Sequence, residues 1–236
     1  MGKQLKFILV FLICLLIYYY GLSINVYAND YNTYSFDVDN IDIKAVDETF
    51  VNTLTVSMKE MKDQNIMNFD VDKNGNIIIC LNNNSVNVYN NALEFLYNID
   101  FDVNGTSIAF WYNEIPAIYL SKTDEIIQVD KNGIISAYKV KNTLENSKTY
   151  RQIRGNRTIV NENCSYKLCY SSSLQKAMMI DPTKMVRVNK EKQEIVYENR
   201  KATTNALIKL SMFILFVLFI WRFIVKKILK TPLRKT

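Results

Sequence analysis

The chain has 236 residues, of which 29 are basic and 23 acidic, so its formal net charge is +6. Nine basic residues lie at the two ends, Lys3, Lys6 and seven from Lys209 onward, which leaves 20 basic against 23 acidic residues and about −3 over the middle. This balance argues against a nucleic-acid-binding protein, because phosphate contacts need a basic surface. The sequence has no histidine, the commonest general base and zinc ligand.

Residues 1–28 have the pattern of a secretory signal peptide. Lys3 and Lys6 precede an uncharged run over 7–20, and Val26 and Ala28 stand at the −3 and −1 positions of a cleavage site. We expect cleavage after Ala28. The alternative is an uncleaved anchor, because residues 7–28 are numerous enough to cross a bilayer.

A second apolar stretch, 206–225, lies near the C-terminus and predicts a transmembrane helix over 204–225. Lys209 and Arg222 can reach the headgroups from the two ends of the stretch. The segment 226–236 is basic and should stay in the cytoplasm by the positive-inside rule. We therefore expect a single-pass protein of the cell membrane with residues 29–203 outside. A buried core helix is the alternative, but a domain of this size offers little to surround it.

The cysteines leave two possibilities open. Cys14 lies within the signal and follows Ile13, where a lipid attachment site needs a small residue. Cys164 and Cys169 enclose four residues and could form a disulfide in an oxidising exterior, or remain free thiols like the unpaired Cys80.

Between the two ends, short β-branched and aromatic runs alternate with turn residues, which predicts a mainly β fold. Asn-Gly pairs at 74–75, 104–105 and 132–133 favour tight hairpins. A helical period is visible over 50–64, where we expect a helix, although its Thr and Val residues also suit a strand. The expected strands are 76–81, 85–90, 94–101, 106–113, 116–121, 125–130 and 134–140.

The chain repeats itself with a period of 41 residues. Residues 85–97 superpose on 126–138, and a weaker third copy covers 184–198. A period near forty predicts units of four strands, here 66–101 and 106–140. The polar stretch 141–163 is expected to be a long surface excursion.

The stretch "FDVDKNGNIIICLNNNSVNVYNNALEFLYNI" resembles the NHL-type β-propeller repeat, and the likeness covers residues 66–140. The resemblance implies four-stranded antiparallel blades. Closed propellers typically need 4 to 8 blades, whereas residues 29–203 allow at most four of 41 residues. We therefore expect an incomplete or degenerate propeller, or one completed by another chain.

One segment resembles a calcium-binding loop. Asp70, Asp72, Asn74 and Gly75 have the spacing of such a loop, but Leu81 stands where the bidentate acid is required, and both flanks are predicted strands. A hairpin turn is the favoured interpretation, since Asp and Asn suit turns for backbone reasons. We predict no metal site and no cofactor.

No catalytic group stands out in the sequence. The serines at 171–173 have no histidine to activate them, and the pairs Asp37/Asp39 and Asp100/Asp102 are expected to lie on exposed strand faces.

The aromatic run Phe110, Trp111 and Tyr112 could form a stacking platform for a ligand, with burial in the core as the alternative. The sequence therefore predicts a membrane-anchored binding protein without catalytic activity, with a protein partner at its β-repeat domain. The alternatives are a lyase or hydrolase on a propeller scaffold, and a structural subunit of an envelope complex.

Overall fold

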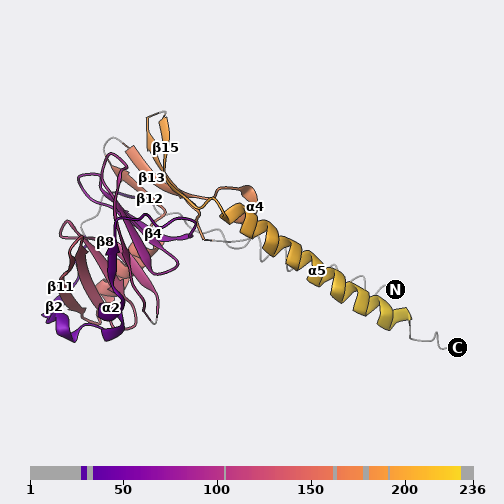
Figure 1. The fold of residues 1–236 in the computed structure, drawn as a ribbon, viewed down its shortest axis with the longest axis horizontal. Helices are drawn as coiled ribbons and strands as arrows, with labels where there is room; N and C mark the ends of the chain where they lie inside the picture. The colour runs from indigo at the N-terminus through magenta and orange to yellow at the C-terminus, as the bar shows by residue number, and fades with distance from the viewer. Residues whose placement is uncertain are drawn as a thin grey trace.

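The computed structural model describes residues 28–30, 34–103, 105–161, 164–177, 181–190 and 192–229. A β-rich body carries one long helix, α5 (Ala202–Leu229), which projects away from it (Figure 1). The expected signal sequence before Ala28 and the tail residues 230–236 lie outside the described residues.

Three five-stranded sheets make up the body, which confirms a mainly β fold, and none of them is closed. Sheet I has the order β3 (Thr55–Ser57), β7 (Phe95–Asp100), β6 (Ser85–Tyr89), β5 (Ile77–Leu81) and β4 (Ile66–Val71). Sheet II has the order β2 (Val38–Ile41), β11 (Gly133–Val140), β10 (Glu125–Asp130), β9 (Ile115–Leu120) and β8 (Ser107–Tyr112). Sheet III has the order β1 (Ala28–Asp30), β12 (Thr158–Asn161), β13 (Cys164–Cys169), β14 (Lys184–Asn189) and β15 (Lys192–Glu198).

Sheets I and II contain the two predicted units of four consecutive antiparallel strands. Sheet III has a further unit of this kind, of which the repeat in the sequence covered only β14 and β15. The expectation of four strands per sheet is wrong, because the N-terminal segment adds a fifth strand to every sheet. β2 and β3 pair antiparallel with β11 and β7, and β1 pairs parallel with β12. The sequence gives little sign of this pairing, since these added strands have only three or four residues.

The 41-residue repeat has a direct structural counterpart. Strand β4, shifted by 41 positions, coincides with β8. Asn68 and Asp70 of β4 hydrogen bond the backbone of Ala109 and Trp111 in β8, each 41 residues further on. The first strand of one repeat therefore binds the first strand of the next through side chains, and the free backbone edge of β8 is satisfied without a sixth strand.

Sheet I lies in the middle and is buried on both faces. Ile78 and Cys80 face a core shared with sheet II, while Ile77 and Ile79 face a core shared with sheet III. Alternate residues of a strand point to opposite faces, so a strand covered on both sides needs a continuous apolar run. This explains the sequence "IIICL" in β5.

The prediction of a helix over 50–64 is wrong for most of this segment. α2 (Glu48–Thr53) begins where the Asp47 side chain accepts hydrogen bonds from Thr49 N and Phe50 N, and the chain then becomes extended as β3. Pairing of β3 with β7 satisfies backbone groups along its edge. This tertiary gain outweighs the weak helical preference of a segment rich in β-branched residues.

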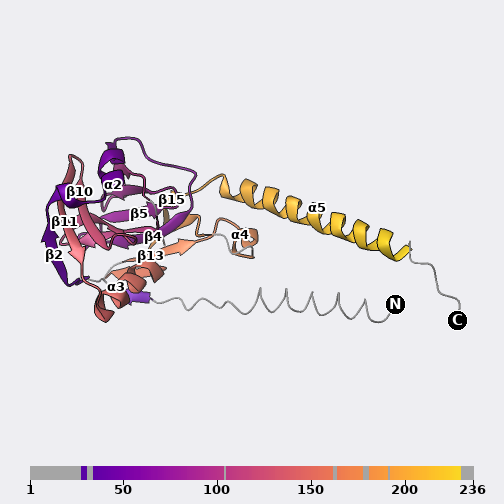
Figure 2. The ribbon, with the colours of Figure 1, turned by 90° about the horizontal axis from the view of Figure 1, so that it is seen from below.

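The excursion expected over 141–163 is also corrected. It contains α3 (Leu144–Gly155) and strand β12. Asn146 and Ile153 of α3 are buried. Ile153 packs with side chains on the outer face of sheet II, and the helix also contacts β4 of sheet I (Figure 2). With α3 in this place, sheet III packs on the opposite side of the body, against sheet I.

The possible disulfide between Cys164 and Cys169 is excluded by the fold. The two cysteines are the first and last residues of β13, and five residue-to-residue steps of extended strand place them roughly 16 Å apart. A disulfide requires Cα atoms within about 7 Å. Both cysteines are free thiols, as is the buried Cys80.

Two short elements remain besides the long helix α5. A 3-10 turn, η1 (Ile43–Ala45), follows β2, and α4 (Ser173–Ala177) precedes β14. In the parts of the chain that the structure describes, no helix meets the combined length and hydropathy of a membrane-crossing segment.

Candidate ligand-binding groove

A groove of about 610 Å³ lies between α3 and sheet II. One wall is formed by α3, and the other by Tyr119 of β9, Val140 of β11 and the chain around Asp124. Its volume falls in the range of small-ligand sites, about 300–1,000 Å³.

Local sequence positions α3 at the groove. Thr143 is the N-cap and accepts a hydrogen bond from Asn146 N at 3.2 Å. Glu145 lies in the first turn and Arg154 in the last, as the helix dipole favours. The N-cap Thr143, with Glu145 in the first turn and Arg154 in the last, was a signal in the sequence that could have identified this helix.

The spacing of side chains along α3 gives it a groove-facing side. Ser147, Tyr150, Arg151 and Arg154 line the groove at positions i, i+3, i+4 and i+7, which share one face of a helix. Ile153 lies outside this set and packs with the side chains of sheet II. The same helix therefore covers a core and presents two guanidinium groups to the groove.

An aromatic pair joins the two walls. The rings of Tyr119 and Tyr150 lie 5.0 Å apart at 45°, and the Tyr119 hydroxyl donates a hydrogen bond to Asp124 Oδ1 at 2.7 Å. Burial raises the pKa of Tyr119 above its ordinary value, and its hydrogen bond to Asp124 adds to the shift. Tyr119 is therefore a neutral donor that holds Asp124 in place.

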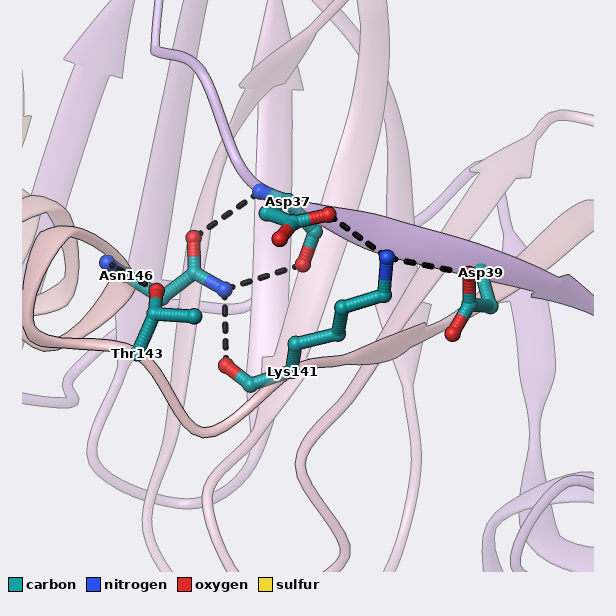
Figure 3. Close-up of polar contacts among 5 residues, drawn as sticks. All are labelled: Asp37, Asp39, Lys141, Thr143 and Asn146. Carbon is teal, nitrogen blue, oxygen red and sulfur yellow. Dashed lines mark hydrogen bonds and ion pairs between the residues drawn. The ribbon is translucent and has the colours of Figure 1, made fainter.

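Lys141 of the groove lining forms an ion-pair clamp with two carboxylates of the N-terminal segment (Figure 3). Lys141 Nζ lies 2.8 Å from Asp37 Oδ1 and 3.3 Å from Asp39 Oδ1. Hydrogen bonds to these carboxylates raise the pKa of Lys141, and the bond to Asp37 has the largest effect. Asp37 and Asp39 are exposed, as expected, and share Lys141 as a partner, but Asp37 precedes strand β2, which begins at Val38.

Asn146 holds the N-terminal segment against this clamp. Its Oδ1 accepts from Asp37 N at 2.9 Å, and its Nδ2 donates to Asp37 O at 2.9 Å and to Lys141 O at 2.7 Å (Figure 3). One side chain thus satisfies backbone groups on two chain segments that are about a hundred residues apart.

The aromatic run singled out in the sequence lies in strand β8 of sheet II, outside the groove lining. Phe110 is 0% exposed and Tyr112 is 8% exposed, and both belong to the core beneath α3. Trp111 points to the opposite face and packs partly buried against the core shared with sheet I. Phe110 and Tyr112 are therefore buried in the core, which was the alternative to a stacking platform.

The other acidic and hydroxyl residues singled out in the sequence do not line the groove, and two of them hydrogen bond locally through their backbone. Asp102 N donates to Thr53 Oγ1 at 2.8 Å, directly after β7, which ends at Asp100. Ser171 N donates to Thr183 Oγ1 at 2.9 Å.

The segment with calcium-loop spacing forms the β4–β5 hairpin, as expected. Asp72 Oδ1 accepts hydrogen bonds from Asn74 N and Asn76 N, both at 2.8 Å, and Gly75 has a φ of +83°. Asp70 is buried and accepts from Trp111 N at 2.8 Å. Desolvation by burial raises the pKa of the Asp70 carboxyl to about 7, although the hydrogen bond from Trp111 acts against the shift.

The comparisons with known proteins give no relative: no family model, no curated protein and no solved structure matches this chain.

The groove-lining residues Arg151 and Arg154 and the tyrosine pair were not identified in the sequence. The reason is that two walls 20 to 30 residues apart meet only after α3 folds back over sheet II. Their i, i+3, i+4 spacing with Ser147 was visible, but only the packing shows which face points into a groove.

Proposed function

We propose that this chain is a membrane-anchored binding protein and that the groove between α3 and sheet II is its ligand site. The observation that carries the proposal is the groove itself, which combines a ligand-sized volume, an aromatic pair and exposed guanidinium groups. Sheet II lies at the end of the body opposite α5 (Figure 1). A groove beside this sheet would lie far from a membrane in which α5 is anchored.

The anchor rests on the character of α5. The large apolar side chains from Ile214 to Trp221 are all exposed, and eight consecutive positions cover every side of a helix. Such a surface fits a lipid environment better than water, and the basic residues that follow favour a cytoplasmic end. Because no described helix qualifies as a membrane span, the anchor is the part of the proposal that experiment must establish.

Membrane extraction tests the anchor. We expect the full chain to stay in the membrane fraction after an alkaline carbonate wash and a chain ending at Lys201 to be released. The double variant L215R/F219R should weaken retention, since each arginine costs about 3 kcal/mol in a bilayer centre. The control I135R changes an exposed apolar residue of sheet II and should remain in the membrane. Retention of the shortened chain would place the anchor elsewhere.

Orientation is tested by protease added to intact cells. We propose that residues 29–203 lie outside and the C-terminus in the cytoplasm, so the β body should be digested while a tag at the C-terminus is protected. A protected β body would reverse the orientation.

Crosslinking tests the groove. A photoreactive residue at Asn142, which lines the groove, should give a discrete adduct in native membranes. The same residue at Met58, which is exposed and does not line the groove, is the control. Equal labelling at the two positions, or no adduct at Asn142, would remove the groove as the binding site.

A further inference from the structure

The cations that line the groove differ in what they contact. Lys141 is held by Asp37 and Asp39. Arg151 and Arg154 are exposed, and neither forms an ion pair with an acidic side chain of the described residues. Two positive charges therefore face the groove without a protein carboxylate to balance them.

The groove lining carries little negative charge. Asp124 is the one acidic residue among the described residues that line the groove, and the Tyr119 hydroxyl donates to it at 2.7 Å. This hydrogen bond disperses part of the carboxylate charge, so the repulsion that Asp124 exerts on an anion is reduced.

The two arginines are placed to bind one anion together. Arg151 and Arg154 lie three residues apart on α3, so their Cβ atoms are about 5–6 Å from each other. Guanidinium groups present planar pairs of N–H donors that match the oxygens of phosphate and sulfate, and they bind such groups bidentately.

We propose that the groove binds a small ligand that carries an oxyanion, a phosphate or a sulfate, held by Arg151 and Arg154. The groove, at about 610 Å³, is larger than the oxyanion alone. The half-buried ring of Tyr150, supported from behind by the buried Tyr119, gives the remainder of the ligand an aromatic surface. This inference rests on the proposed function, because it names the ligand class of the same groove.

The test is calorimetric titration of the detergent-solubilised full chain with phenyl phosphate and with phenyl sulfate. Neutral phenol is the ligand control. We expect at least one of the two anions to bind more tightly than phenol, with an affinity that falls as salt is raised. The preferred probe distinguishes a phosphate-bearing from a sulfate-bearing ligand.

The variant R151Q/R154Q should weaken binding of the preferred probe at least tenfold. The matched control K148Q removes a positive charge from the same helix at an exposed position outside the groove lining and should leave binding within twofold. Circular dichroism and the melting temperature confirm that each variant is folded.

Three results would overturn the ligand class. The first is that the parent chain binds neither anion. The second is that R151Q/R154Q binds the preferred probe as tightly as the parent does. The third is that K148Q loses as much affinity as R151Q/R154Q, which would mean unspecific attraction. An adduct at Asn142 in membranes together with any of these results keeps the groove as a binding site and rejects only the oxyanion. Anion binding without that adduct would reject the groove's role in the membrane.

Discussion

The side-chain amide of Asn146 in α3 pairs with both backbone groups of Asp37, accepting from its N and donating to its O, each at 2.9 Å. This is the hydrogen-bonding pattern of a neighbouring strand, supplied by a side chain. The pair ties the segment before β2 to the helix that forms one wall of the groove (Figure 3).

Replacing Asn146 with alanine should therefore destabilise the protein. N146A removes three hydrogen bonds, those of Asp37 N, Asp37 O and Lys141 O, although Asp37 O still accepts from Lys141 N at 3.1 Å. Each hydrogen bond contributes about 0.5–1.5 kcal/mol. We expect a loss of about 2–4 kcal/mol in the free energy of unfolding, measured by urea denaturation in detergent. N142A changes an exposed asparagine of the same loop and should stay within about 0.5 kcal/mol of the parent. A similar small effect of N146A would show that the amide pairing contributes little.

Asn68 makes the equivalent contact between sheets I and II. It accepts from Ala109 N at 3.1 Å and donates to Ala109 O at 2.6 Å, and it is fully buried. N68A should reduce the free energy of unfolding by about 2–4 kcal/mol, because two backbone groups of the β8 edge lose their partner. N82A, at an exposed turn position, is the control. Equal denaturation midpoints for N68A and N82A would contradict the bridging role.

Asp70 should make stability depend on pH. Its folded-state pKa of about 7 lies above that of an unfolded aspartate, near 4, so the folded protein holds a proton that the unfolded chain has released. The contribution is fully present below about pH 4 and is lost as pH rises to about 7, by up to about 1.4 kcal/mol per pH unit.

The variant D70N isolates this effect. Asparagine cannot titrate, and its oxygen can still accept from Trp111 N. Urea unfolding at several pH values between 4.5 and 7.5 should show a smaller fall in stability with rising pH for D70N than for the parent. Parallel curves for the two proteins would mean that Asp70 does not titrate in this range.

Gly75 should tolerate no side chain in the β4–β5 turn. Its φ of +83° is unfavourable for other residues, and an added Cβ would lie 3.3 Å from Asn91 Cβ. We expect G75A to lower the free energy of unfolding by about 1 kcal/mol or more. G155A is the matched control, since the last residue of α3 has nothing within 4 Å of the added Cβ and alanine is the better helix former. A G75A protein as stable as G155A would exclude turn strain.

Much of the local fold could be predicted from the sequence. Alternating apolar residues and the Asn-Gly pairs at 74–75 and 132–133 identified the hairpins β4–β5 and β10–β11, and the 41-residue period identified the equivalence of β4 and β8. These features depend on side-chain alternation and turn geometry, which act over a few residues. The helix α3 was missed although Thr143 marks its start.

The groove could not be predicted, because its lining residues come from segments that are far apart in the sequence. Arg151 lies on a helix whose exposed side is set by its packing on sheet II, and Tyr119 reaches the groove from a strand some thirty residues earlier. The aromatic run at Phe110 is a possible ligand platform by its sequence, but Tyr34 and Phe36 of the N-terminal segment pack on its rings in a core that also contains Ile153 of α3. Burial of a strand face depends on what packs against it, and the sequence of the strand does not show whether an apolar face is covered or exposed.

The sequence by itself determined four-stranded units, their spacing and the apolar C-terminal stretch, because hydrophobic period and turn residues are local properties. Tertiary structure alone decided that the N-terminal segment adds a strand to every sheet, that α3 takes the place of a further sheet, and that Arg151, Arg154 and the tyrosine pair meet at one groove. Those outcomes depend on which buried backbone groups and apolar faces find partners across the whole chain, as Asn68 does with Ala109 and Asn146 with Asp37.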